Sequence, residues 1–320
     1  MEDGREILSN VVHSQIDIHR VYGGVVPEIA CRAHIETIHP VVEKALADAK
    51  VALRDVDAIA VTCAPGLVGA LLVGLSMAKS LALAANKPIL GVDHIHGHMY
   101  ATKLAFPDLA YPCVNLVVSG GHTSLYLSKS EIDHEPLGAT SDDAAGEAFD
   151  KVAKILQLGF PGGPIIDGLA KGRDPGKVVF KRTVPDSLDF SFSGLKTSVL
   201  YRVKGQDGKG ALTLNADERA DVAAGFQEAV VDVLVEQSLK ACLRTRTWRL
   251  AVGGGVACNT RLREKLTARA AKEGVTVYFP PPKYCTDNAA MIAGLGHHLL
   301  KAGRVGDLYL DVVATKHHKP

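Results

Sequence analysis

The chain has 320 residues, enough for two lobes or one large α/β domain, and its 47% hydrophobic and 22% charged residues are ordinary for a soluble globular protein. With 36 Lys and Arg against 35 Asp and Glu, net charge argues neither for nor against a nucleic-acid partner. The six cysteines are widely scattered without a C-x-x-C pair, which argues against a disulfide framework or a structural zinc site and favours reduced thiols in the cytosol.

Neither secretion nor a membrane location is expected. The chain opens without a basic, apolar and small-residue leader, so we expect no signal peptide. Residues 58–78 carry no formal charge, but Pro65 and Gly66 divide a β-rich run from a run rich in Ala, Leu and Gly. A buried strand, a turn and a buried helix explain this stretch better than a transmembrane helix.

The first part of the chain alternates strands and helices. Strands are predicted at residues 7–12, 58–63 and 89–92, and helices at 28–50, 67–86 and from the histidine segment to 104. This β-α-β-α order is typical of a mostly parallel sheet covered by helices.

A second series of elements begins at residue 113. Strands are predicted at 113–118, 123–127, 133–139, 249–252 and 275–279, and helices at 144–156, 216–243, 259–273 and 288–301. Strand-turn-strand-strand-helix followed by alternating elements is how each half of a duplicated, actin-like ATPase (ASKHA) fold is built. We therefore predict an α/β fold of two lobes, with mixed sheets flanked by helices and a ligand cleft between the lobes.

The predicted N-terminal lobe comprises residues 1–112, with 289–320 packing back on it, and the C-terminal lobe comprises 113–288. By internal symmetry, an initial strand and its phosphate-facing turn should precede Ile7, where only six residues stand. We therefore expect the first lobe to lack its first strand. Such a loss would leave unpaired ladder groups and a gap in the core.

His94 and His98 stand four apart on a predicted helix and can point two imidazoles at one ion, whereas His96 faces elsewhere. Such a pair is more often two histidines on a helix surface than a metal site. No Glu follows the first His, as zinc peptidases require for their general base, so peptidase chemistry loses support. Asp287 is the best candidate for a third ligand, although spacing alone favours a helix-capping role for it.

Glycine-rich turns predict places where backbone can approach an anion. Residues 119–123, Ser-Gly-Gly-His-Thr, fit either an anion cradle or a plain hairpin turn. Residues 253–255 are three glycines between a strand and a helix containing Asn259, a geometry suited to a phosphate or nucleoside, without a Walker A or dinucleotide signature. Residues 161–164, Pro-Gly-Gly-Pro, predict a rigid turn just before Asp167.

Charged residues supply further candidates. Asp142 and Asp143 fit a cap and first-turn role at a helix start, while Glu147 and Asp150 can face the cleft. Lys196 stands beside polar residues and suits a phosphate or RNA, although each of these groups also fits a structural role. Residues 171–204 carry eight Lys and Arg against three Asp, a local excess that can meet a phosphate backbone, although a solvated loop face is better supported.

Together these motifs closely resemble TsaD, the bacterial tRNA threonylcarbamoyltransferase family formerly described as a sialoglycoprotein endopeptidase. The resemblance covers nearly the whole chain in one order, through residues 22–28, 64–71, 94–98, 118–123, 142–151, 189–197, 253–259 and 285–288. One departure concerns the start, because family members open with a strand and an Asp-Glu-Thr turn that nothing before Ile7 matches.

The resemblance implies transfer of a threonylcarbamoyl group from threonylcarbamoyl-adenylate to N6 of the adenosine at position 37 of tRNAs that read codons beginning with A, with release of AMP. It implies one divalent metal ion, Fe²⁺ ahead of Zn²⁺, held by His94, His98 and Asp287 so that it polarises the substrate carbonyl. The adenylate-binding residues that it implies are Val117, Val118, Ser119, Gly120, Gly121, Asp150, Gly163, Asp167 and Asn259.

Further expectations follow from the resemblance. It implies the smaller paralogue TsaB and the P-loop ATPase TsaE as partners, in the cytoplasm and away from membranes. Residues 171–204 become the expected tRNA surface, with Lys181 and Arg182 as test positions. No general base is assigned.

Three rival functions are weighed against this one. A noncatalytic scaffold subunit of the same complex is disfavoured because a scaffold has no need of the ligands His94, His98 and Asp287. An actin-fold sugar or acetate kinase would transfer a phosphoryl group from ATP. A metallopeptidase ranks last.

Overall fold

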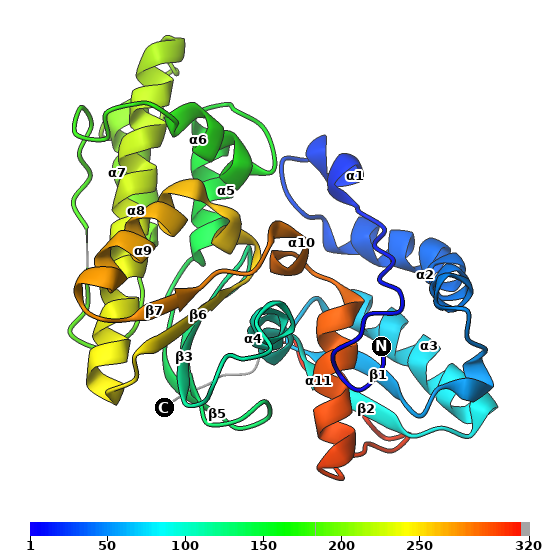
Figure 1. Cartoon of the computed structure of the whole chain (residues 1–320). Helices are drawn as coiled ribbons and strands as arrows, with labels where there is room; N and C mark the ends of the chain where they lie inside the picture. Colours follow the sequence, from blue (N-terminus) through cyan, green and yellow to red (C-terminus); the bar gives the residue numbers. More distant parts are fainter. Residues whose placement is uncertain (183, 315–320) are drawn as a thin grey trace.

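The computed structural model describes residues 1–182 and 184–314. Its strands form two sheets, one from residues 59–93 and one from residues 113–278, and helices flank both (Figure 1). The predicted α/β architecture with helix-flanked sheets is therefore confirmed.

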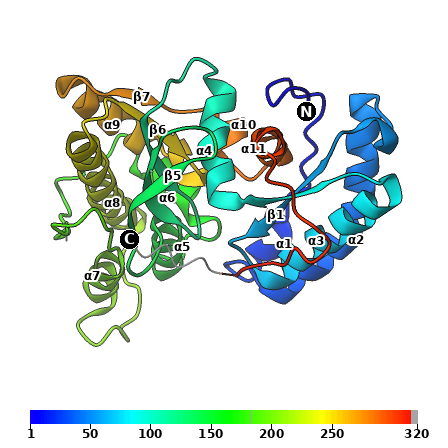
Figure 2. The same ribbon diagram turned by 90° about the horizontal axis from the view of Figure 1, so that it is seen from below.

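The N-terminal sheet has two strands within the described residues, β1 (Ile59–Ala64) and β2 (Ile89–Asp93), which pair in parallel. On one face, β1 packs against α3 (Val68–Ala85), which in turn packs against α2 (Pro27–Ala49) (Figure 2). On the other face lies α11 (Ala289–Lys301), from the far end of the sequence. Strand alternation explains this arrangement, because Ile59 and Val61 join the apolar cluster with α3 whereas Ala60 joins the cluster with α11.

Residues 7–12 do not form the predicted strand. They follow an extended path, and Asn10 Oδ1 accepts a hydrogen bond from the N–H of Ala290 (3.3 Å) at the start of α11. No described strand pairs with them. Apolar β-branched residues form a strand only where a neighbouring backbone completes the ladder, so this prediction is wrong.

The C-terminal sheet has five strands in the order β5-β4-β3-β6-β7. β3 (Cys113–Val118), β4 (Thr123–Ser128) and β5 (His134–Ala139) form an antiparallel meander. β6 (Arg249–Gly253) and β7 (Thr276–Tyr278) continue the sheet in parallel to β3. The first strand of the series thus lies at the centre, as the predicted fold requires.

Helices cover the C-terminal sheet and contribute most of the largest apolar core. They are α5 (Ala145–Ile155), α6 (Gly162–Ala170), α7 (Ser193–Lys204), α8 (Ala216–Thr245) and α9 (Thr260–Lys272). In this core the rings of Phe149 and Phe226, from α5 and α8, meet edge to face at 5.3 Å. The core holds both helices against the strand ends that carry the glycine turns.

The helix α4 (His94–Ala105) joins the two halves. It begins directly after β2 and packs against β3 and β6 of the other sheet as well as against α11. The buried Thr102 hydroxyl donates to the Val252 carbonyl oxygen in β6 (3.2 Å). Figure 1 shows α4 between the two sheets. His94 and His98 belong to this helix.

Several short elements were not predicted. They are α1 (Ile16–Arg20), η1 (Leu53–Asp55), η2 (Gly255–Cys258) and α10 (Pro282–Cys285), together with the longer α6 and α7. The Pro-Gly-Gly-Pro segment was predicted as a turn, but Gly162 already begins α6, because proline is well accommodated in the first turn of a helix.

The stretch without formal charge is divided as predicted into β1, a turn at Pro65 and Gly66, and α3, but the prediction that the helix is buried is wrong. Within the described residues, α3 is the one helix long and apolar enough to cross a membrane, by length and composition only, with a mean hydropathy of 1.8. Only 17% of it is buried in the chain. Its remaining apolar surface borders a groove shared with α2.

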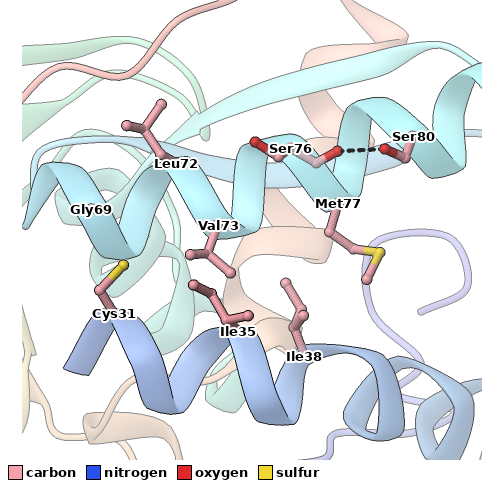
Figure 3. Close-up of a pocket in the computed structure, with 9 residues that line it drawn as sticks. All are labelled: Cys31, Ile35, Ile38, Gly69, Leu72, Val73, Ser76, Met77 and Ser80. Atoms are coloured by element: carbon pink, nitrogen blue, oxygen red, sulfur yellow. Dashed lines mark hydrogen bonds between the residues drawn. The ribbon is translucent and has the colours of Figure 1, made fainter. Parts of the chain in front are cut away.

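Residues Ile35 and Ile38 of α2 and Val73 and Met77 of α3 point toward one another across this groove (Figure 3). The groove has a volume of about 580 Å³. Ile35 is 61% exposed and Leu72, on its rim, is 43% exposed. Large apolar side chains gathered at one exposed place are typical of a protein–protein contact.

Candidate active site

Two histidines and an aspartate converge between the two sheets. Asp93 caps α4 by accepting from the N–H groups of Ile95 (2.9 Å) and His96 (3.2 Å), which fixes the first turn of the helix. His94 and His98, one turn apart, approach Asp287 Oδ1 with their Nε2 atoms at 3.4 and 3.2 Å. One ligand atom from each of the three lies within 4.8 Å of the others.

The segment between α10 and α11 places Asp287. Its neighbour Asn288, not Asp287, caps α11: the Asn288 side chain accepts from Met291 N–H (3.0 Å) and donates to the Thr286 carbonyl oxygen (2.9 Å). The Asp287 carboxylate is thereby left to face the histidines. Spacing alone favoured Asp287 as the helix cap, but Asn288 has that role.

These three residues fit a divalent metal ion. Both ring nitrogens of His98 are buried and make no hydrogen bond within the described part of the chain, since the 3.2 Å contact with Asp287 is poorly directed. A buried nitrogen without a partner is costly, and a metal ion would satisfy Nε2. Two imidazoles and one carboxylate leave coordination positions open, as a catalytic site requires.

The charges of the site act on one another. Burial lowers the pKa of His94, but contact with Asp287 and the charges of Asp287 and Asp93 outweigh it and raise that pKa. At His98 burial prevails over the contact with Asp287, so its pKa is lowered. The surrounding protein disfavours the charge of Asp287, although its side chain is exposed at 78%, yet the two histidines hold its pKa well below the usual range. A neutral His98 and an ionised Asp287 are the forms that ligate metals.

The glycine turn between β3 and β4 lies against the start of α5. Ser119 N–H donates to the His122 carbonyl oxygen (2.8 Å), and Gly146 N–H in α5 donates to the Ser119 carbonyl oxygen (3.1 Å). A Cβ atom on Gly120 or Gly121 would meet nothing within 4 Å, and their N–H groups donate no hydrogen bond within the described part of the chain. The turn therefore offers two N–H donors to a ligand.

Val117 and Val118, which precede this turn, are fully buried. Val117 packs with Ile95 and Met99 of α4, and Val118 belongs to the large core. These two predicted residues therefore present no exposed surface to a ligand in this conformation.

The second glycine turn brings β6 close to β3. Gly254 has φ +90°, and a Cβ there would lie 2.3 Å from the Val118 carbonyl oxygen. A Cβ on Gly253 would lie 2.6 Å from the carbonyl oxygen of His98. Only glycine allows this approach, so the turn holds β6 close to α4 and to the end of β3.

The other predicted adenylate residues lie around the starts of α6 and α9. Asp150 accepts from Gly162 N–H (2.7 Å), and burial raises its pKa despite that hydrogen bond. Asp167 accepts from the hydroxyl (2.9 Å) and N–H (3.2 Å) of Thr260. Gly163 has open space around its Cα, where a Cβ would meet nothing within 4 Å.

Asn259 is buried and caps α9 by accepting from Leu262 N–H (2.9 Å), while its amide donates to Gln227 (2.7 Å). Through Thr260, this cap is joined to Asp167. The structure thus connects α5, α6 and α9 around one region, and it shows structural roles for Asp150, Asp167 and Asn259.

One sequence interpretation needs correction. Asp142 does not cap α5; it accepts from Phe192 N–H (2.8 Å) and the Ser193 hydroxyl (2.8 Å), and so caps the unpredicted α7. Lys196, for which both a phosphate or RNA contact and a structural role were open, pairs with Asp143 (3.1 Å).

The basic segment 171–204 is partly neutralised by acidic side chains. Arg173 pairs with Asp217 (2.5 Å), Lys177 with Asp221 (3.4 Å), and Arg182 with Asp232. Within the described residues, Lys171, Lys181 and Arg202 are exposed without an ion pair. An attraction for RNA in this segment would come chiefly from those three.

Comparison with known proteins decides the family. The family model of TsaD, tRNA N6-adenosine threonylcarbamoyltransferase, matches residues 6–294. The chain belongs to the TsaD family. The tRNA N6-adenosine threonylcarbamoyltransferase of Syntrophus aciditrophicus is 50% identical over 98% of this chain and 92% of the relative, and that of Anaeromyxobacter dehalogenans is 53% identical over 97% and 93%.

Solved structures resemble the fold at much lower identity. Full-length HypF, in its phosphate- and nucleotide-bound form, has a TM-score of 0.59 at 13% identity over 82% of this chain and 41% of that chain. HypF of T. kodakarensis has a TM-score of 0.57 at 14% identity, over 82% and 43%. Together with TsaD membership, this likeness confirms the predicted actin-like ATPase fold, and at such identity it shows the fold alone.

TsaD membership confirms that the chain is a transferase acting on tRNA. The kinase and peptidase alternatives gain no support from the relatives, whose names are those of acyltransferases.

One feature of this TsaD site was missed as a candidate. His122, in the turn between β3 and β4, has its pKa lowered to about 4 by burial and by His94 and His98.

Proposed function

We propose that this chain transfers the threonylcarbamoyl group from threonylcarbamoyl-adenylate to N6 of the adenosine at position 37 of tRNAs that read codons beginning with A. The observation that carries the proposal is identity of about 50% along nearly the full length of curated relatives named tRNA N6-adenosine threonylcarbamoyltransferase. The new bond joins N6 to the carbamoyl carbon, the bond from that carbon to the phosphate oxygen breaks, AMP leaves, and the amine proton passes to water.

In this proposal His94, His98 and Asp287 hold one divalent ion, Fe²⁺ as first choice and Zn²⁺ as the alternative. When bound, the ion supplies Lewis acidity toward the substrate carbonyl. The geometry that supports this assignment is the convergence of the three ligand atoms and the unsatisfied ring nitrogens of His98.

We assign the N–H groups of Gly120 and Gly121 to the adenylate phosphate, with Ser119 and the main chain of Val117 and Val118 completing the turn. Support comes from the open space at both glycines. Asp150, Gly163, Asp167 and Asn259 are assigned to the nucleoside side, where the starts of α6 and α9 approach each other. Backbone N–H groups there also favour an anion.

We further propose that residues 1–112 with 289–314 form one lobe and residues 113–288 the other, with the adenylate bound between them. Support comes from α11, which packs on β1 and β2. The predicted lobe also included residues 315–320, which lie outside the described residues. A tRNA substrate further supports a cytoplasmic location.

The partners TsaB and TsaE are also proposed. We assign the α2–α3 groove to the paralogue TsaB, because an apolar groove of this kind suits a permanent neighbour of similar fold (Figure 3). No surface is assigned to TsaE.

A reconstituted reaction tests the function. The purified chain, TsaB, TsaE, unmodified tRNA and threonylcarbamoyl-adenylate are combined, and the modified nucleoside is detected by mass spectrometry. We expect product with the wild type and a loss of at least about a hundredfold with His98→Ala. His39→Ala, on the exposed side of α2, is the matched control and should keep both product and metal.

Absence of product with all components present would favour the scaffold alternative. Product together with an unchanged metal content in His98→Ala would instead remove the metal assignment while keeping the transferase.

A further inference from the structure

Arg263 of α9 joins two segments that border the candidate active site. Its Nε donates to the Ala257 carbonyl oxygen in η2 (2.7 Å), and its Nη2 donates to the Pro280 carbonyl oxygen (2.7 Å). The guanidinium also lies over the Phe279 ring, with Cζ 4.9 Å from the ring centre. Ala257 and Pro280 are both buried. One planar cation therefore fixes η2 relative to the segment that leads into α10.

The segment between β7 and α10 depends on this cation because it has few donors of its own. Residues 280–282 are three prolines, which carry no N–H group. The main chain can therefore be held here only through its carbonyl oxygens. Within the described residues, the other donor to the Pro280 oxygen is the Cys285 thiol at 3.5 Å, and a thiol is a weaker donor than a guanidinium.

We propose that Arg263 is a positioning residue for Asp287, and the proposal rests on the metal assignment made under the proposed function. Asp287 follows the proline segment through α10, and α10 packs against both η2 and α4, the helix of the two histidines. The Asp287 side chain is mostly exposed, so packing around it does not place it. Its place is set by the main chain on either side, which Arg263 anchors before it and the Asn288 cap anchors after it.

Loss of the guanidinium would remove the main donor from two buried carbonyl oxygens. A buried acceptor without a partner is costly, so the proline segment would shift toward water or another donor, and Asp287 would move with it. Groups that orient a ligand without touching the metal typically change metal affinity by about 10- to 100-fold. We therefore expect Arg263→Met, which keeps an unbranched side chain and removes every donor, to weaken Zn²⁺ binding at least about tenfold.

The test measures Zn²⁺ affinity of the full-length protein by competition with a chromophoric chelator, and thermal unfolding in parallel. Arg269→Met is the matched control, because it makes the same substitution on the same helix. Arg269 is half exposed and contacts Glu273 at 3.7 Å, away from η2 and the proline segment. This control should bind Zn²⁺ as the wild type does.

A double-mutant cycle with Asp287→Asn separates positioning from general loosening of the fold. If Arg263 acts through the Asp287 carboxylate, Arg263→Met should change Zn²⁺ affinity by less than about twofold once that carboxylate is gone. An equal loss in both backgrounds would show that Arg263 supports the whole fold instead, and would overturn the proposal. So would an unchanged affinity in both backgrounds.

Arg263→Lys keeps the charge but not the planar fork that reaches two oxygens at once. Its Zn²⁺ affinity should fall between those of the wild type and Arg263→Met, and it carries the same cycle if Arg263→Met does not fold. Wild-type affinity in Arg263→Lys would overturn the role assigned to the double hydrogen bond. A wild type that binds no Zn²⁺ would overturn the metal assignment along with this inference, whereas a wild type and an Arg263→Met variant that bind equally well would overturn this inference alone.

Discussion

Neighbouring residues divide two tasks at the end of the loop before α11. Asn288 caps the helix through Met291 N–H, and Asp287 contacts the histidines. Because the cap and the carboxylate belong to different side chains, stability and metal binding can be separated by mutation. Few helix starts allow this separation, since an aspartate in the capping position would serve both purposes.

Asp287→Asn keeps the size of the side chain and removes its charge. We expect metal affinity to fall by at least about a hundredfold because one of three ligands is lost, with little change in stability. Elemental analysis after dialysis measures the metal content, and thermal unfolding measures stability.

Asn288→Ala is the complementary change. It should lower the free energy of unfolding by about 1 kcal/mol through loss of the cap while metal is retained. Equal metal loss in both variants would show that the cap, and not the charge of Asp287, governs the site.

Gly146 tests the turn between β3 and β4. A Cβ at this position would lie 2.6 Å from the Ser119 carbonyl oxygen and 2.8 Å from Gly120 Cα, and backbone cannot easily yield. We expect Gly146→Ala to displace the turn, to cost about 1–3 kcal/mol of stability and to weaken adenylate binding at least about tenfold. Isothermal titration with a non-hydrolysable adenylate analogue measures the affinity.

Gly168→Ala, in the interior of α6, is the control for this substitution. No atom lies within 4 Å of its added Cβ, so it should stabilise the protein by about 0.5–1 kcal/mol without changing affinity. If Gly146→Ala left the adenylate affinity unchanged, the turn would not be the phosphate site.

Helices α8 and α9 are joined by a charge cluster at Glu228. Its carboxylate accepts from Arg261 at 2.6 and 2.9 Å and from Lys265 at 2.5 Å, and these partners lower its pKa from 4.5 to about 2. A carboxyl whose pKa is lowered in the folded protein makes its full contribution to stability above pH 4.5. That contribution disappears as the pH falls from about 4.5 to about 2.

Glu228→Gln should therefore lower the free energy of unfolding at pH 7 by at most about 3 kcal/mol, since each pKa unit corresponds to about 1.4 kcal/mol. At pH 2 the difference from the wild type should vanish. Urea unfolding at both pH values checks this. A constant difference at all pH values would assign the effect to packing instead of charge.

Local patterns predicted most elements, but they could not predict those fixed by distant partners. The strand at β3 and the helix at α8 are evident from apolar runs and periodicity. By contrast, α7 begins at a cap from Asp142, about fifty positions away, which no local rule can find. The strand prediction at residues 7–12 was wrong for the same reason, because a strand forms only where a neighbouring backbone pairs with it.

The candidate site shows the same limit. Helical spacing predicted that His94 and His98 share one face, and the structure confirms it. Spacing could not place Asp287 beside them, because nearly two hundred residues intervene; the family resemblance did so. The hydrogen bond from Asn259 to Gln227 also joins residues 32 positions apart, so local patterns could not predict it.

At the scale of the whole molecule, the α2–α3 groove predicts an assembly surface. Ile35→Glu and Leu72→Glu each place a charge in apolar surroundings, so binding of TsaB should weaken at least about tenfold. Leu83→Glu is the control, because Leu83 is 70% exposed on α3 but does not line the groove. Surface plasmon resonance gives the affinities. Equal affinity for all three variants would place TsaB elsewhere.

The tRNA surface is tested by removal of unpaired charge. Lys181→Ala and Arg202→Ala should each weaken tRNA binding and reduce the slope of log affinity against log salt by about 1. Arg182→Ala is instructive as a contrast, because it breaks an ion pair with Asp232 and should act mainly on stability. Unchanged salt slopes in Lys181→Ala and Arg202→Ala would exclude this segment from the interface.

The helix α4 couples the proposed metal ligands to the relative position of the two sheets. Within residues 1–182 and 184–314, the chain passes between the sheets through α4 and through the segment from α10 to α11, and these segments carry the three proposed ligands. Rotation of one sheet relative to the other must therefore change the ligand geometry. An ion that binds more tightly at one interlobe angle stabilises the protein at that angle. By thermodynamic linkage, a substrate that favours another angle lowers the affinity for the ion, and the ion lowers the affinity for that substrate by the same free energy.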